Sequence, residues 1–112
     1  MVDYALSQKN GATVATWADV ATDDTNNSFP NGFQKGVAGC VQVFGTFNGG
    51  TVASMEVSND GSNWETLTDV AGALVSMESA ALFEFSSTAL YIRPKVESGS
   101  SDAVDFVMVM RG

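Results

Sequence analysis

Polar and apolar side chains alternate at the start of the stretch 51–67. A polar turn follows this alternation, and a tryptophan comes directly after the turn. Met55 and its alternate neighbours fall on one side of an extended chain, while the Ser and Glu side chains fall on the other. Asn59, Asp60 and Gly61 tolerate the left-handed backbone of a tight reversal, so we predict a structural turn there. The stretch is therefore predicted to be a β-hairpin whose apolar side other strands must cover.

The same alternation recurs elsewhere along the chain. It predicts strands over residues 13–20, 89–97 and 104–110, and more weakly over residues 1–9. Because turn-bounded short strands set the rhythm of the surrounding chain, residues 73–77 and 81–85 are also interpreted as strands, despite helix-like spacing of their apolar residues.

Residues 37–47 carry apolar side chains on both faces, which predicts a central strand with a bulge at Gly45. The glycine-rich turn 48–50 is of the kind that joins antiparallel neighbours. We therefore expect this strand to pair with the stretch 51–67, so that two successive hairpins form a meander.

About eight short strands and no convincing helix indicate an all-β fold, namely an antiparallel β-sandwich or a jelly-roll-like arrangement. The length of 112 residues fits a single domain, predicted to span residues 1–112. Within it, residues 1–12 are predicted to form an N-terminal arm or an edge strand.

Residues 21–36 are dense in turn-forming residues and are predicted to be a long loop that carries two phenylalanines. Phe29 and Phe33 are interpreted first as core anchors, and a contact with a partner is the competing interpretation. On that second interpretation, the partner interface comprises Phe29, Pro30 and Phe33, together with Tyr4 from the N-terminal arm.

Charge and composition exclude several classes of function. The formal net charge is -8 and histidine is absent, so the commonest general base and zinc ligand are missing, and no catalytic role is expected. The five Lys and Arg residues are scattered, and only Arg93 and Lys95 share a strand face, so nucleic-acid binding is disfavoured. Cys40 is the only cysteine, which excludes an intrachain disulfide.

The chain offers no motif for a bound cofactor, a metal or a membrane. The Asn59–Asn63 segment is rich in oxygen ligands, but it lacks the spacing of a calcium loop, and a turn bonded to its own backbone accounts for it better. The first ten residues do not resemble a signal peptide, and no segment is long and apolar enough to span a membrane. Synthesis in a cytoplasm is therefore expected.

Trp17 and Trp64 are the candidates for a carbohydrate-binding platform, because small β-sandwich domains use exposed aromatic rings to stack against sugars. The favoured interpretation for each is a core position, with Trp64 fixing the hairpin 51–67 to the core. Binding of a glycan at these two residues is kept as the alternative function.

Three segments carry a resemblance to a known group of proteins: SNDGSNWETL at residues 58–67, LYIRPKV at residues 90–96, and the closing apolar strand at residues 104–110. In these features the chain resembles small virion structural proteins of tailed bacteriophages, which share such a turn in a compact β-sandwich. The resemblance implies a capsid decoration or cement protein, or a head-fibre or tail component. It implies that the major capsid protein or other virion proteins are the partners. A small acidic β domain of this kind commonly packs as a homotrimer.

Overall fold

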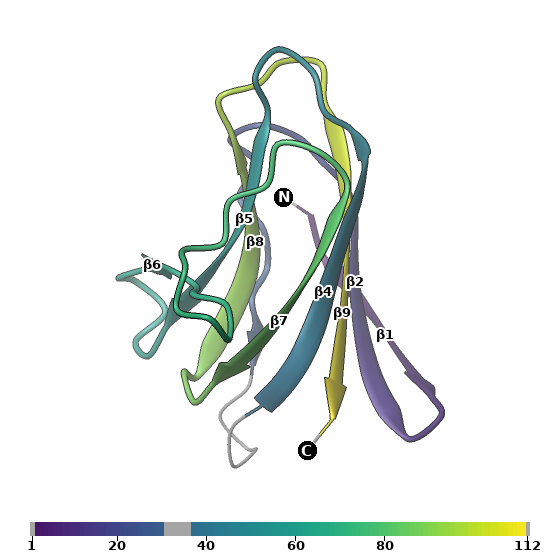
Figure 1. The fold of residues 1–112 in the computed structure, drawn as a ribbon, viewed down its shortest axis with the longest axis vertical. Helices are drawn as coiled ribbons and strands as arrows, with labels where there is room; N and C mark the ends of the chain where they lie inside the picture. Colours follow the sequence, from purple (N-terminus) through teal and green to yellow (C-terminus); the bar gives the residue numbers. More distant parts are fainter. Residues whose placement is uncertain (1, 31–36, 112) are drawn as a thin grey trace.

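Nine strands form two antiparallel sheets within the residues that the computed structural model describes, 2–30 and 37–111. The strands are β1 (Tyr4–Lys9), β2 (Ala12–Val20), β3 (Phe29–Pro30), β4 (Val37–Thr46), β5 (Val52–Ser58), β6 (Glu65–Thr66), β7 (Ala81–Ser87), β8 (Tyr91–Glu97) and β9 (Ala103–Arg111). One sheet has the order β1-β2-β9-β4-β7 and the other has the order β3-β8-β5-β6. The sheets face each other (Figure 1), which confirms the predicted antiparallel β-sandwich.

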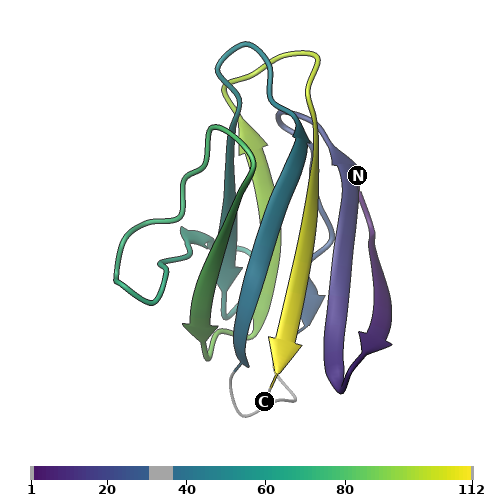
Figure 2. The same ribbon diagram turned by 45° about the vertical axis from the view of Figure 1, so that its right-hand side comes forward.

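The core lies between the sheets and follows the period-two pattern of the strands. Strand β9 is paired on both sides, with β2 and with β4, and its alternate residues from Val104 to Met110 are nearly inaccessible. Trp17 from β2 and Met55 from β5 join the same cluster, so both sheets contribute to one continuous core. The predicted 1–12 segment supplies β1, which is an edge strand (Figure 2).

The predicted meander over residues 37–67 is wrong. Strand β4 belongs to the five-stranded sheet and β5 to the four-stranded sheet, so the turn 48–50 carries the chain across the sandwich. Strand β4 instead lies between β9 and β7, which confirms its central position. A glycine-rich turn can join two neighbouring strands of one sheet or two strands of different sheets. The pairing of β4 with β7 and β9 decides between these connections, and both of these strands are distant from β4 in sequence.

Two smaller predictions also need correction. The pairing of β4 with β9 runs without a shift through Gly45, and the irregularity of this sheet lies between Trp17 and Val20 instead. Residues 73–77 form only isolated bridges, at Leu74 and Met77, whereas the second predicted piece is strand β7. The hairpin of β5 and β6 and the strand character of residues 91–97 and 103–111 are confirmed.

At one end of the sandwich, a buried carboxylate ties three connecting segments together. Asp102 accepts hydrogen bonds from the Thr22 backbone nitrogen at 2.8 Å and from the Thr22 and Thr51 hydroxyls at 2.6 Å each. Gly99 lies against this carboxylate and the Thr51 hydroxyl so closely that a Cβ atom would collide with both. This cluster fixes the loops that precede β5 and β9 and the loop that follows β2.

Candidate interaction face

The outer face of the four-stranded sheet is charged. Arg93 donates from Nε to Glu56 Oε1 at 3.0 Å, and the Lys95 ammonium lies 3.8 Å from carboxylate oxygens of both Glu56 and Glu97. The Arg93 guanidinium also stacks over the Trp64 ring, 3.8 Å from its centroid. These cations are matched by neighbouring carboxylates, so the face is suited to contact with water.

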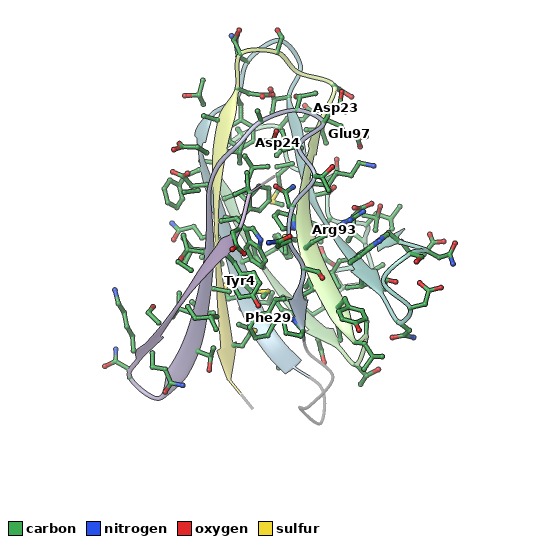
Figure 3. All side chains as sticks on the ribbon, turned by 180° about the vertical axis from the view of Figure 1, so that it is seen from behind. Tyr4, Asp23, Asp24, Phe29, Arg93 and Glu97 are labelled. Carbon is green, nitrogen blue, oxygen red and sulfur yellow. The ribbon has the colours of Figure 1, made fainter. Side chains whose placement is uncertain are left out.

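A cleft of about 200 Å³ opens beside this charged face, between β8 and the loop that follows β2. Its lining includes Asp23, Asp24, Arg93 and Lys95. Figure 3 shows Asp23 and Asp24 on the loop after β2 and Arg93 on β8. Asp24 Oδ2 accepts a hydrogen bond from the Ala21 backbone nitrogen, so that carboxylate holds its own loop. The cleft has no surplus of positive charge that would attract an anion.

The outer face of the five-stranded sheet has the opposite character. Two rows of cross-strand neighbours cross all five strands, and cross-strand neighbours point to the same side of a sheet. We call these outward positions and the adjacent Phe44 the apolar face, which comprises Ser7, Val14, Val109, Cys40 and Glu84 in one row and Ala5, Thr16, Val107, Gln42 and Leu82 in the other. Among these described residues Glu84 at the β7 edge is the only charged side chain, and Asp105, the cross-strand partner of Phe44, borders the face.

The apolar face is accessible. Leu82 is 60% exposed and Phe44 is 38% exposed, while Val107 and Val109 are half-buried between their neighbours. A hollow of about 320 Å³ lies near the β7 edge and is lined by Cys40 and Val109 among others, with Val70 contributed by the loop that follows β6. Exposed apolar residues gathered on a nearly uncharged face typically mark contacts with other proteins.

Cys40 lies on the apolar face, and its surroundings disfavour the thiolate. Partial burial raises the pKa of the thiol, and the negative charge of nearby Glu84 raises it further. Because the thiolate is the nucleophile, this thiol is poorly suited to catalysis but remains within reach of a small alkylating reagent. It is therefore useful as a probe of whether the face is covered.

The structure brings together two of the four residues predicted for the partner interface. The Tyr4 ring lies 5.7 Å from both the Trp17 and the Phe29 ring centroids, and Figure 3 shows Tyr4 beside Phe29. Phe29 is buried, which confirms its interpretation as a core anchor, whereas Pro30 is exposed. Phe33 lies outside the described residues.

The two tryptophans proposed as a glycan platform lie in different environments. Trp17 is fully buried, and its indole nitrogen donates to the Asn27 carbonyl oxygen at 2.8 Å, so it offers no surface to a sugar. This corrects its candidacy as a platform residue. Trp64 is half-buried against Arg93 on the charged face and does not enter the core cluster, so the prediction that it fixes the hairpin 51–67 to the core is wrong.

The predicted structural turn is confirmed in detail. Asp60 accepts hydrogen bonds from the backbone nitrogens of Ser62 and Asn63 at 2.8 Å each, and from the Asn63 side chain at 2.7 Å. These bonds, with one from Ser58, lower the pKa of Asp60 well below its usual value. Gly61 has a φ of 76°, the left-handed conformation for which glycine is suited. The carboxylate oxygens thus serve the turn itself.

The apolar face was not identified as a site from the sequence, although its signal was present. Val107 and Val109 alternate with buried residues of β9, and residues 37–47 are apolar on both sides. A strand with two apolar sides normally indicates a sheet covered on both faces. In this fold the second side is instead directed outward, which only the layer arrangement reveals.

The sequence matches no protein-family model and no curated protein, and the fold matches no solved structure. No helix in the described part of the chain is both long and apolar enough to cross a membrane. Within residues 2–30 and 37–111, His, Cys, Asp and Glu side chains form no group of three that could hold a metal ion. Functional inference therefore depends on the fold and on the chemistry of its surfaces.

Proposed function

We propose that this protein is a structural component of a tailed-bacteriophage virion, a capsid decoration or cement protein that acts as an oligomer on the head shell. The observation that supports this proposal best is the contrast between the two outer faces of the sandwich. One face carries matched charges, and the other is nearly uncharged, with exposed apolar residues such as Leu82 and Phe44. Such an asymmetry is typical of a domain that works by protein contact.

The carboxylates that accept hydrogen bonds or form ion pairs in this fold support a role without catalysis. Asp102 accepts hydrogen bonds that connect three loops, and Asp60 accepts hydrogen bonds within its own turn. Glu56 forms ion pairs with two cations. A catalytic carboxylate is instead usually directed into a pocket with a raised pKa or a matched partner group. We therefore propose that the acidic residues of this chain maintain the fold and its solubility.

The charge distribution also supports a position on the outside of the shell rather than on the genome. Arg93 and Lys95 are the two neighbouring cations of β8, and Glu56 and Glu97 lie within ion-pair distance of them. With a net charge of -8, the chain would be repelled by a phosphate backbone. We propose virion proteins as the partners, with neither nucleic acid nor a membrane involved.

The candidate surface for attachment to the major capsid protein lies along β1 and β3. Tyr4 is half-buried, Pro30 is exposed, and Leu6 on the same strand face as Tyr4 is 57% exposed. An edge strand with an apolar residue of this kind is a ready docking element, because its outer backbone groups are not paired within the sheet. This surface is distinct from the apolar face.

The experiment uses heads of the virus whose genome encodes this chain, prepared without it. We expect the purified protein to sediment with these heads to a fixed number of copies per shell. Leu6→Asp should weaken this binding at least tenfold, whereas Leu90→Asp, at an exposed position away from β1, should bind normally. Absence of binding to the heads would refute the proposed function.

A glycan-binding module of a phage tail or fibre is the second candidate, and Trp64 alone supports it. The ring is half-buried, and the Arg93 guanidinium stacks on one of its two faces. A ligand that stacked on the opposite face of the ring would therefore lie near a cation. Glycan binding there should quench tryptophan emission in wild-type protein but not in Trp64→Phe. Unchanged emission across neutral and acidic glycans would eliminate this candidate.

A further inference from the structure

We propose that the apolar face is the contact between two copies of this chain, packed face to face about a two-fold axis. This inference goes beyond the virion role, because it concerns the isolated protein in solution. Two twisted sheets pack face to face in this way, at about 10 Å separation and about 30° between strand directions. The assembly would then contain four sheet layers, with the charged faces outermost.

Charge favours a second copy as the occupant of this face. With a net charge of -8, two copies repel each other unless they meet where acidic groups are sparse. The acidic groups on and beside this face are Glu84 at the edge strand and Asp105, the cross-strand partner of Phe44, whose carboxylate accepts a hydrogen bond from the Asp19 backbone nitrogen at 2.8 Å. A basic partner would gain little from this face, because exposed carboxylates such as Asp23 and Asp60 lie on loops elsewhere.

The polar residues of the apolar face are compatible with a two-fold axis. Gln42 and Thr16 lie on either side of Val107 in one row, and each side chain can both donate and accept hydrogen bonds. In an isologous contact each surface must satisfy an identical one, so groups with both capacities suit it. A row of carboxylates or ammonium groups could not pair with its own copy.

The outer surface of the whole five-stranded sheet, with the apolar face at its centre, is large enough for a stable pair. Five strands at about 4.8 Å spacing and about seven residues of paired length at about 3.3 Å each give roughly 550 Å² per copy for this surface, which includes Asp105 and Lys9 beyond the two rows. Both copies together therefore bury on the order of 1,100 Å², and side-chain relief such as Leu82 and Val70 raises this figure. That area is at the lower end of specific interfaces, so we expect a dissociation constant in the micromolar range.

Sedimentation equilibrium tests the pair directly. We expect wild-type protein to approach twice the chain mass of 11.7 kDa as its concentration rises. Val107→Lys and Val107→Glu should each raise the dissociation constant at least about 100-fold, because each copy brings an unpaired charge into the contact. The matched control is Val52→Lys, a half-buried valine facing outward beside Glu97 on the other sheet, which should leave the pair intact.

Alkylation of Cys40 gives a second and independent readout, since it is the only cysteine of the chain. We expect its rate to fall as wild-type protein is concentrated, and to stay constant for Val107→Lys. Cooperative unfolding of each variant verifies that it is folded. A wild-type chain that stays monomeric, a trimer, or a dimer unaffected by both Val107 substitutions would each overturn the proposal.

These outcomes separate this inference from the proposed function. A monomer whose Cys40 becomes protected only on viral heads would show that the shell, not a second copy, covers the apolar face. A trimer that binds heads would support the virion role and the copy number typical of such domains, while overturning the two-fold pair. A dimer that binds no head would support the pair and refute the virion role.

Discussion

The buried Asp102 cluster makes a specific prediction about stability. The carboxylate accepts three hydrogen bonds, two from Thr22 and one from Thr51, and it is 7% exposed. Hydrogen bonds to a charged group contribute about 1.5–3 kcal/mol each, and they do not add fully. Asp102→Asn keeps one carbonyl oxygen as an acceptor, so part of this contribution survives. The Thr51 hydroxyl oxygen also lies 2.6 Å from the Asn48 carbonyl oxygen, which can accept the hydroxyl's hydrogen bond in place of Asp102. We therefore expect a loss of about 2 kcal/mol in the free energy of unfolding.

The pH dependence of this loss is the sharper test. Burial by itself raises the pKa of Asp102, but the hydrogen bonds from Thr22 and Thr51 outweigh it and hold the pKa below its usual value. A carboxyl whose pKa is lower when folded stabilises the protein above the unfolded pKa of about 3.9, and this stabilisation is lost as the pH falls through the folded pKa. Wild-type protein and Asp102→Asn should therefore converge in stability in strongly acidic solution.

Urea unfolding at pH 7, 5 and 3 measures both effects. Asp105→Asn is the control, because Asp105 accepts a hydrogen bond from the Asp19 backbone nitrogen at 2.8 Å and is more exposed than Asp102. Asp105→Asn should lower the free energy of unfolding by less than about 1 kcal/mol at pH 7. The reasoning is refuted if Asp102→Asn costs no more than this control, or if its cost is the same at pH 7 and pH 3.

Three further substitutions test the core and the charged face. Met108→Ala, in the fully buried row of β9, should lower the free energy of unfolding by about 3 kcal/mol in urea titrations, and a loss below 1 kcal/mol would mean that the sheets are loosely packed. Trp17→Phe removes the bond to the Asn27 carbonyl and should cost about 2 kcal/mol by the same assay, while abolishing the blue-shifted part of the emission; an unchanged spectrum would contradict its burial. Arg93→Ala should cost at most about 1 kcal/mol and shift Trp64 emission to longer wavelength, and no shift would contradict the stacking.

The alternation of polar and apolar residues predicted the strands well, because side chains of every strand point alternately to the two sides of its sheet. Residues 104–110 alternate strictly, and the residues that share the buried side are those that the alternation grouped together. The Asn59–Asn63 turn was also predictable, since Asp60 bonds to residues two and three positions further on. Both features depend on contacts that a short piece of chain can specify by itself.

Pairing between distant strands was not predictable in the same way. The turn 48–50 joins two sheets rather than two neighbouring strands, because β4 pairs with β7 and β9, whose paired residues lie 38 to 73 positions further along the chain. The environment of Trp64 was missed for a related reason. Its ring meets Arg93 from another strand, and this contact keeps it on the outer face.

By itself the sequence determined that the chain is all-β, where most strands begin and end, and that it is acidic and lacks histidine. These properties follow from side-chain periodicity and composition, which are local or additive. Tertiary structure alone decided which apolar side of β4 and β9 is directed inward and which forms the apolar face. The physical reason is that either apolar side of such a strand can be covered by another layer of the same chain or by a partner protein. Only the order of the layers in the fold shows which side is covered by the chain itself.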